Sequence, residues 1–319
     1  MPTTQLRILL LAPECNPDSI STPSIAYAHA NALARFHRVT LVVRAVHEQS
    51  IRRAGGDFHG IEAIRLPWLD GLYSWALRRI FKYDYGRQSL TAATYPLQVV
   101  FECRAWRHLR RRIQSREFDV VLRLLPIVSV LPSPFAYFLR NGPIPFVIGP
   151  LNGGLPWPQG FPQLEKQRQQ AGYWVSNLRG LYRYLPFARA TYAKATAIIA
   201  GSSHTYSEFA AYGEKLFFVP GENGIDPALL NGRARVDGPR DGRLRLVFVG
   251  RLIPLKACDL ALRAAADLLR AGHAQFTVVG DGPGDVVNEL RRECVRRHLP
   301  SPGCAIAEGP CVADNLARG

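Results

Sequence analysis

The fold of this chain is constrained most by an alternation of short, largely apolar runs with longer amphipathic segments. Leu6–Pro13 and Arg38–Val43 are runs of strand length, and Ile25–Phe36 between them has the pattern of a helix. Two such strands joined by a helix form a βαβ unit, which has a right-handed crossover and parallel strands. The sequence therefore predicts an α/β protein whose parallel sheets lie between helices.

The alternation continues beyond this first unit. The loop after Pro13 lacks the glycines of a dinucleotide-binding fingerprint, which disfavours an NAD-binding first domain. Further strands of the same kind are predicted at Ile61–Leu66, Phe118–Leu124, Pro145–Gly149, Ala197–Ala200 and Leu216–Pro220.

A basic amphipathic helix is predicted around residues 99–113, with its arginines and His108 on one side. Two interpretations of this helix are open. It can lie on an anionic membrane surface, or it can cover one face of the sheet while its charges stay in water. The apolar side contains Val99, Cys103, Trp106, Leu109 and Ile113.

The segment GPLNGGLPWPQG, residues 149–160, is rich in glycine and proline and is predicted to be an open loop. It follows a predicted parallel strand, and open α/β sheets bind ligands at the carboxyl ends of their strands. Asn152 offers an amide group, and Gly153 and Gly154 would let a ligand approach the backbone closely. We therefore expect a ligand-binding loop here.

A polar stretch near residue 230 divides the chain. Residues 228–242 contain glycines and charged residues with little apolar content, which is typical of a linker. A length of 319 residues is sufficient for two cores. The sequence predicts a first domain at residues 1–227, a linker at 228–242 and a second domain at 243–319.

The second domain begins with a strand that leads into fixed positive charges. Leu246–Val249 is wholly apolar and is expected to be buried on both faces of a sheet, and Gly250 lets the backbone turn. Arg251 and Lys256 precede a predicted helix, Ala257–Ala271, whose N-terminus favours anions. This arrangement suits a diphosphate, but the same cations also fit an ordinary turn with solvated side chains.

The chain carries a net charge of +15, from 40 Lys and Arg against 25 Asp and Glu residues. Such an excess indicates an anionic partner, which could be a nucleotide, a phospholipid surface or nucleic acid. Nucleic acid is disfavoured, because no known nucleic-acid-binding module is present and the arginines are dispersed over several helices.

The cysteines and the hydropathy pattern bear on cofactors and location. The six cysteines form no CxxC pair and have no histidine at zinc spacing, so no metal site is predicted and reduced thiols are expected. No signal peptide is predicted, and no apolar run reaches the roughly 18 residues of a membrane span. We expect a soluble cytoplasmic protein, or one bound peripherally to the inner face of a membrane.

Three motifs occur in an order that resembles one enzyme family. NGID at 223–226, VGRLIPLK at 249–256 and GDGP at 280–283 are similar to the donor half of the family 4 retaining glycosyltransferases, which have the two-domain GT-B architecture. The N-terminal βαβ unit and the GPLNGG segment resemble the acceptor half. The resemblance covers nearly the whole chain and implies two Rossmann-like, doubly wound parallel-sheet domains, the second of them incomplete.

The resemblance implies that a sugar, of hexosyl type, is transferred from a nucleotide-diphosphate-sugar donor to a glycan or lipid-linked acceptor. Retention of anomeric configuration and a role in polysaccharide biosynthesis are implied, without a metal or another cofactor. Arg251 and Lys256 would bind the donor diphosphate. The nucleotide-sugar would lie near Gly250, Gly282, Asn223 and Gly224, and the acceptor-side loop would include Asn152, Gly153, Gly154 and Ser24.

Three departures from the family pattern bear on activity. The glycine pair that usually follows the first strand is replaced by Pro23 and Ser24, and Arg123 and Leu124 stand where many members have a sugar-binding histidine. The paired glutamates of the second domain, Glu-x7-Glu, are absent, so no catalytic residue is assigned. The chain thus resembles an enzyme that is cut short. The alternative is an inactive module, derived from such an enzyme, that binds a membrane surface or an acceptor.

Overall fold

The computed structural model describes residues 4–19, 21–79, 88–128, 131–153, 184–220, 242–252, 256–280, 288, 292, 294–296 and 304–307. The chain divides into two compact units, Met1–Pro162 with Gln169–Asp226 and Gln163–Arg168 with Pro227–Gly319. Each unit has its own parallel sheet and its own hydrophobic core, which confirms the predicted α/β class. Residues 228–241 of the predicted linker lie outside the described residues.

The first unit is built on a seven-stranded sheet in the order β3-β2-β1-β4-β5-β6-β7, and each neighbouring pair of strands is parallel. The order runs outward from β1 to β3 on one side and from β4 to β7 on the other. β1 and β4 therefore flank the point where the winding reverses, beyond which open α/β sheets bind ligands. The strands are β1 (Arg7–Leu11), β2 (Arg38–Arg44), β3 (Gly60–Ile64), β4 (Val120–Arg123), β5 (Phe146–Leu151), β6 (Ala197–Ala200) and β7 (Leu216–Phe218).

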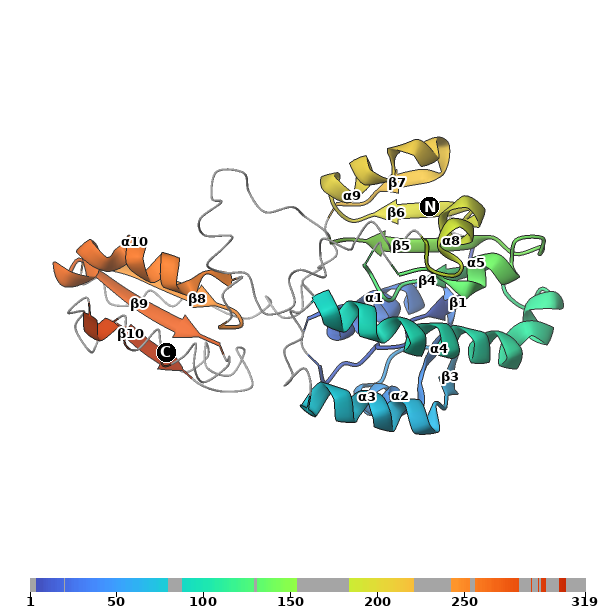
Figure 1. Cartoon of the computed structure of the whole chain (residues 1–319), viewed down its shortest axis with the longest axis horizontal. Helices are drawn as coiled ribbons and strands as arrows, with labels where there is room; N and C mark the ends of the chain where they lie inside the picture. The colour runs from blue at the N-terminus through green and yellow to red at the C-terminus, as the bar shows by residue number, and fades with distance from the viewer. Residues whose placement is uncertain are drawn as a thin grey trace. The chain divides into compact units, whose positions relative to one another are not determined.

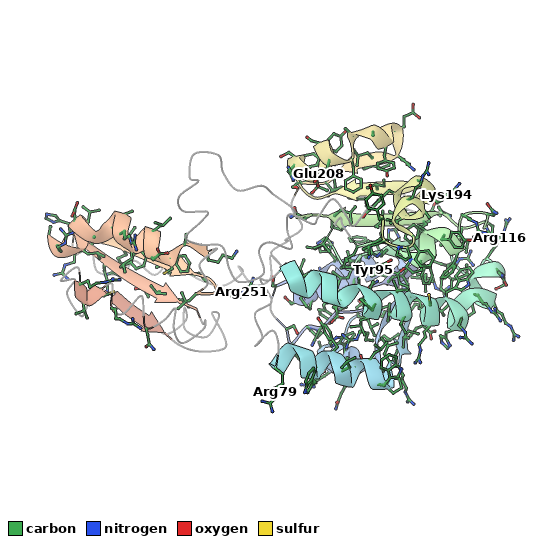
Figure 2. The ribbon with its side chains drawn as sticks, in the orientation of Figure 1. Arg79, Tyr95, Arg116, Lys194, Glu208 and Arg251 are labelled. Atoms are coloured by element: carbon green, nitrogen blue, oxygen red, sulfur yellow. The ribbon has the colours of Figure 1, made fainter. Side chains whose placement is uncertain are left out.

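The central strand β1 is buried on both faces. Leu9 and Leu11 belong to a core that contains residues of α4, whereas Ile8 and Leu10 belong to a second core with α1. Helix α4 runs across one face of the sheet (Figure 1), and side chains fill the space between them (Figure 2). The helices of this unit are α1 (Thr22–Ala34), α2 (Ala45–Ala54), α3 (Pro67–Arg79), α4 (Gln88–Gln114), α5 (Pro134–Phe138), α8 (Ala188–Lys194), α9 (Ser203–Glu208) and the 3-10 helix η2 (Ala210–Lys215).

Helix α4 is the predicted basic helix, and it covers the sheet with its apolar side. Phe101 and Leu109 are fully buried in the core. On the other side, His108 Nε2 lies 2.9 Å from a Glu62 carboxylate oxygen, and Arg112 pairs with the same carboxylate. The apolar side of α4 is therefore not available to a membrane.

The buried face of α4 is rotated from the one that the sequence predicts. Val99 and Cys103 are only partly buried, whereas Glu102 and Ala105 are fully buried. The prediction fails here because Glu102 pairs with the buried Arg123 of β4, which turns this charged residue toward the sheet.

The second unit contains a three-stranded parallel sheet in the order β10-β9-β8. Helix α10 packs on it through Leu262, Ala265 and Leu269, which share a core with Phe276 and Val278. The third strand, β10, pairs in parallel with β9. Between β9 and β10, residues 288, 292 and 294–296 are described, and these are helical. The elements are β8 (Leu244–Val249), α10 (Cys258–Arg270), β9 (Ala274–Val279) and β10 (Cys304–Ala307).

The prediction that Leu246–Val249 is buried on both faces is wrong. Leu246 and Phe248 pack against the core with α10, but Val247 and Val249 are 55% and 51% exposed. Across this sheet the strands are placed in sequence order, from β8 at one edge through β9 to β10. Because right-handed crossovers then place their helices on the same face, the opposite face of β8 stays exposed.

Two further expectations concern thiols and membrane spans. Cys15, Cys103, Cys258 and Cys294 form no disulfide bonds, in agreement with the reduced thiols that were predicted. None of the helices within the described ranges is long and apolar enough to cross a membrane.

Candidate functional site

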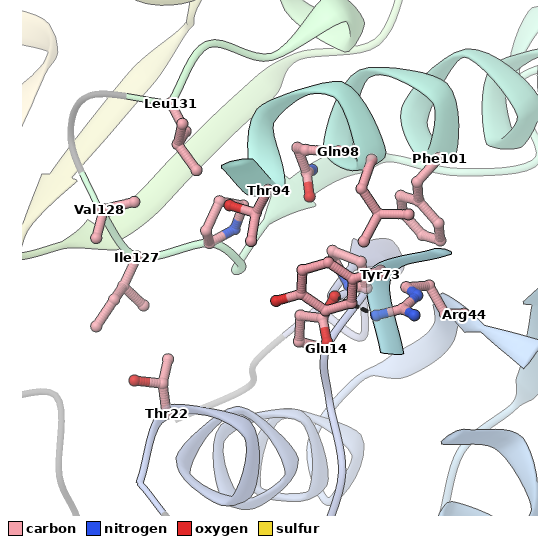
Figure 3. Close-up of a pocket in the computed structure, with 13 residues that line it drawn as sticks. Glu14, Thr22, Arg44, Tyr73, Thr94, Gln98, Phe101, Ile127, Val128 and Leu131 are labelled. Carbon is pink, nitrogen blue, oxygen red and sulfur yellow. Dashed lines mark hydrogen bonds and ion pairs between the residues drawn. The ribbon is translucent and has the colours of Figure 1, made fainter. Parts of the chain in front are cut away.

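A cavity of about 240 Å³ lies at the carboxyl ends of β1, β2 and β4 in the first unit (Figure 3). Pro13 and Glu14 follow β1, Arg44 ends β2, and residues 126–128 follow β4. Helices α3 and α4, Thr22 of α1 and Leu131 supply the remaining walls. The cavity thus sits where the strand order reverses, which is the position at which sheets of this type bind ligands.

The walls of the cavity combine apolar and hydrogen-bonding groups. Thr22, Tyr73 and Thr94 contribute hydroxyl groups, and Gln98 contributes an amide (Figure 3). Hydroxyl and amide groups can both donate and accept hydrogen bonds, so they suit a ligand that carries several hydroxyl groups. The apolar part of the wall contains Pro13, Leu97, Phe101, Pro126, Ile127, Val128 and Leu131.

An ion-pair cluster forms the floor of the polar side. The Arg44 side chain is only 4% exposed, and its Nη1 donates to Glu14 Oε1 at 2.6 Å. Its Nε and Nη2 donate to Asp70 Oδ1 at 2.9 and 2.5 Å. The guanidinium also lies 5.4 Å from the centre of the Tyr73 ring. One arginine lies between two carboxylates here, which disfavours a phosphate group as the ligand of this cluster.

Glu14 remains ionised at neutral pH. Burial acts to raise the pKa of the Glu14 carboxyl, but a hydrogen bond from His47 and the positive charge of Arg44 outweigh burial and hold the pKa below its ordinary value. His47 Nε2 lies 3.4 Å from the second Glu14 oxygen, and Asn16 lies 3.4 Å from His47 Nδ1. The cavity is therefore lined by a carboxylate whose orientation is fixed from two sides.

The lowered pKa of Glu14 predicts a pH dependence of stability. Because its pKa is ordinary in the unfolded chain, about 4 to 5, the stabilisation from Glu14 is fully present above that range and is lost as the pH falls below it, through the lower pKa of the folded chain. Urea unfolding at several pH values should show that acid lowers the free energy of unfolding less for Glu14→Gln than for the wild-type chain. Equal losses in the two proteins would contradict this assignment.

A second polar network lies behind the cavity wall. Gln98 lines the cavity and donates to Glu102 Oε1 at 2.5 Å. Glu102 Oε1 also accepts from Arg123 Nε at 3.2 Å, and Glu102 Oε2 accepts from Ser133 Oγ at 2.5 Å. The side chains of Glu102 and Arg123 are both 0% exposed. The network links the cavity to the core through charged groups that are removed from water.

Arg123 has unused hydrogen-bonding capacity. Its Nη1 and Nη2 have no hydrogen-bond partner among the described residues. A buried polar group without a partner destabilises the folded protein by about 1–3 kcal/mol. A water molecule or a ligand that accepts hydrogen bonds from these atoms would therefore bind there favourably. The sequence singled out Arg123 only by its position and missed Glu102, although an acidic residue between Phe101 and Ala105 on the apolar side of a helix was a usable signal.

Asn152 and Gly153 follow β5 and lie beside one edge of the cavity. Asn152 forms a parallel β-bridge with Val128, which is a lining residue. Its side-chain oxygen accepts a hydrogen bond from Gly153 N at 2.8 Å, so it holds the backbone turn. Gly154, the third predicted residue of this loop, lies outside the described residues.

The placement of Ser24 in a loop is wrong. Ser24 lies in the first turn of α1, where its Oγ donates to the Ser21 carbonyl at 3.0 Å. Pro23 permits this early helix start, because the first turn needs no intrahelical N–H donor at that position. The residue of this turn that lines the cavity is Thr22, which the sequence did not single out.

The predicted cations of the second unit lie at the carboxyl ends of its strands. Gly250 and Arg251 directly follow β8, and Lys256 precedes α10. Arg251 is partly exposed and Lys256 is exposed, and neither forms an ion pair with a described residue. Both cations are therefore available near the N-terminus of a 13-residue helix. The other predicted residues of this site, Asn223, Gly224 and Gly282, lie outside the described residues.

Gly250 and Gly280 bring two backbones into direct contact. Gly250 N donates to the Val279 carbonyl at 3.0 Å. A Cβ on Gly280 would lie 1.9 Å from the Gly250 carbonyl oxygen, which is a collision with main-chain atoms. The strand ends therefore form a surface of bare backbone next to the two cations.

This contact makes Gly280 more constrained than Gly250. Gly280→Ala is expected to destabilise the second unit by about 3 kcal/mol or more, because the added methyl group must displace the backbone. Gly272→Ala is the matched control: no atom lies within 4 Å of its new Cβ, so only the positive φ of +72° costs stability, about 1 kcal/mol. Urea unfolding monitored by circular dichroism gives the free energy of unfolding of each variant. Equal decreases in the two variants would contradict the close approach of Gly280 to the Gly250 carbonyl.

The sequence comparisons with known proteins are limited to one short segment. No family model matches the chain. A segment of 53 residues is 58% identical to a D-inositol 3-phosphate glycosyltransferase of Frankia alni, and it represents 17% of this chain and 11% of that protein. The match therefore spans only a small part of the curated relative.

The structural comparisons cover nearly the whole chain. It is similar over 98% of its length to an α,α-trehalose-phosphate synthase (UDP-forming) from Burkholderia vietnamiensis, with a TM-score of 0.56, 14% identity and 74% of that chain covered. It is similar over 95% of its length to Anabaena Alr3699/HepE, solved with UDP and glucose, with a TM-score of 0.51, 14% identity and 69% of that chain covered. The lipopolysaccharide outer core galactosyltransferase WaaB matches 98% of the chain at 8% identity and a TM-score of 0.53, with 70% of WaaB covered. The fold is thus that of the GT-B glycosyltransferases, as the sequence resemblance implies.

Proposed function

We propose that this protein transfers a sugar from a nucleotide-diphosphate-sugar donor to a hydroxyl group of an acceptor. The observation that carries the proposal is the strand edge of the second unit, where Gly250 and Gly280 expose backbone beside Arg251 and Lys256. Bare backbone lets a phosphate approach closely, and two cations without a described acidic partner can neutralise it. The likeness to a glycosyltransferase fold solved with UDP and glucose supports this choice of ligand.

The cavity of the first unit is proposed as the acceptor site. Its hydroxyl and amide groups suit a polyhydroxylated group, and its apolar wall suits the carbon face of a sugar ring. The excess negative charge of the cluster formed by Glu14, Arg44 and Asp70 disfavours a phosphate at this position. The portion of the acceptor that enters the cavity is therefore proposed to be an uncharged sugar or polyol.

The proposed reaction needs little covalent chemistry from the protein. An acceptor oxygen bonds to the anomeric carbon of the donor sugar, the bond from that carbon to the diphosphate oxygen breaks, and the proton of the acceptor hydroxyl passes to the departing diphosphate or to water. Negative charge then develops on the departing diphosphate, where Arg251 and Lys256 would stabilise it. Retention of configuration, a hexose as the transferred sugar and independence of metal ions belong to this proposal through the family resemblance.

The experiment that tests the function is a donor screen. The chain is incubated with UDP-, GDP- and ADP-sugars, with and without mono- and disaccharide acceptors, and the released nucleoside diphosphate and the glycosylated product are measured. Product that requires both donor and acceptor is the expected result. Binding of a sugar acceptor without any release of nucleoside diphosphate would overturn the proposal and favour a binding module.

A further inference from the structure

Helix α3 has an apolar side that faces water. Trp68 is 65% exposed, Leu72 is 53% exposed and Trp75 is 51% exposed. Positions separated by four and three residues lie on the same side of a helix, so these side chains form one continuous patch. Single exposed apolar residues are common on soluble proteins, but a row of three that includes two tryptophans is typical of an interaction surface. Trp68, Leu72 and Trp75 form the α3 patch.

The opposite side of α3 is fixed to the protein. Leu69 and Tyr73 pack against the core, and Asp70 binds Arg44. The helix therefore cannot rotate to bury Trp68 and Trp75 without breaking these contacts. Tyr73 is also a lining residue of the cavity, so one side of this helix borders the proposed acceptor site while the other side is in water.

The surroundings of the α3 patch are basic. Arg65 precedes the helix, Arg79 ends it with an exposed side chain (Figure 2), and Arg104 of α4 donates to the Arg65 carbonyl at 2.6 Å. Within the described ranges, none of these three arginines forms an ion pair. Asp70, the acidic residue within Pro67–Arg79, is only 13% exposed and pairs with the buried Arg44.

Tryptophan side chains flanked by arginines match the surface of an anionic bilayer. Tryptophan rings bind at the boundary between headgroups and acyl chains, and cations bind anionic headgroups. We propose that the α3 patch docks on an anionic lipid surface. Since Tyr73 brings the same helix to the cavity, the acceptor would be a lipid-linked sugar or polyol at that surface, an assignment that rests on the proposed function.

The test measures binding of the full chain to lipid vesicles. Vesicles of phosphatidylcholine mixed with phosphatidylglycerol are compared with phosphatidylcholine alone by co-sedimentation. The variant Trp68→Gln/Leu72→Gln/Trp75→Gln is expected to bind the anionic vesicles on the order of a hundredfold more weakly, because it loses the apolar side chains that enter the bilayer. The variant Arg65→Gln/Arg79→Gln should bind anionic vesicles about fivefold more weakly for each charge removed. Its binding to phosphatidylcholine vesicles should not change.

A matched control separates the α3 patch from exposed apolar side chains in general. Phe36, Val46 and Phe217 are 65%, 54% and 53% exposed and lie on other elements. The variant Phe36→Gln/Val46→Gln/Phe217→Gln is expected to bind vesicles as the wild-type chain does. Equal binding by the wild-type chain and the α3 variant would overturn the proposal. So would a wild-type dimer in gel filtration that the α3 variant does not form.

The same samples distinguish this proposal from the proposed function. Binding of nucleoside diphosphate to the second unit is measured in the absence of lipid. Nucleotide binding without vesicle binding overturns the membrane proposal alone. Vesicle binding that depends on the α3 patch, without nucleotide binding, supports docking and overturns the transferase function together with the assignment of the acceptor.

Discussion

Replacing both Arg251 and Lys256 with alanine is expected to weaken binding of a nucleoside diphosphate by about a hundredfold to ten-thousandfold. Each cation can donate charge-assisted hydrogen bonds to the diphosphate, and each such bond contributes about 1.5–3 kcal/mol, or roughly tenfold to a hundredfold in affinity. Neither residue is buried, so the variant should fold normally. Isothermal titration calorimetry measures the affinity, and thermal unfolding checks the fold.

Arg263 and Arg270 provide the matched control for this variant. Both lie on α10 of the same unit, and their side chains are 47% and 45% exposed. Arg263→Ala/Arg270→Ala removes the same amount of positive charge away from the strand edge. If this control weakens diphosphate binding as much as Arg251→Ala/Lys256→Ala does, the cations act through net charge, and the assigned site is wrong.

Replacing Glu102 with leucine is expected to destabilise the first unit by about 3–5 kcal/mol. The change leaves the Arg123 guanidinium buried without a counter-charge, and breaking a buried ion pair from one side has a cost of this size. It also removes the acceptor for Ser133 Oγ and for Gln98. Urea unfolding monitored by circular dichroism gives the free energy of unfolding.

The double variant Glu102→Leu/Arg123→Met shows whether the loss comes from the ion pair. With both charges removed, apolar side chains fill the space, and such replacements of buried pairs are often neutral or stabilising. The double variant should therefore be more stable than Glu102→Leu alone. If the losses from the two single changes simply add, Glu102 and Arg123 do not act as a pair, and the network behind the cavity wall is wrongly assigned.

The strands were predictable because each is a short apolar run, and such runs identify themselves locally. Leu6–Pro13 and Ala197–Ala200 were found this way, and both occur as strands in the sheet. The order of the strands was not predictable from the same pattern, because it depends on pairing between residues far apart in the chain. Leu11 pairs with Val42 on one side and with Arg123 on the other, and this pairing is what creates the cavity.

The site residues could be predicted only where they lie close together in the sequence. Gly250, Arg251 and Lys256 are close in sequence, so a motif reveals them, although their role is still a proposal. The cavity depends on Glu14, Arg44 and side chains from four separate segments, and no local pattern unites these. Exposure could not be predicted from the sequence either: Trp68, Leu72 and Trp75 of α3 lie in water, whereas Leu69 of the same helix packs against the core.

The central claim is that the second unit binds a nucleoside diphosphate through its terminal phosphate. Titration calorimetry of UDP and GDP against UMP and GMP tests it most directly, because the pairs differ only in that phosphate. At least one diphosphate is expected to bind about tenfold or more tightly than its monophosphate, and the difference should disappear in Arg251→Ala/Lys256→Ala. Equal affinities for the diphosphates and monophosphates, or no binding of either, would contradict the account.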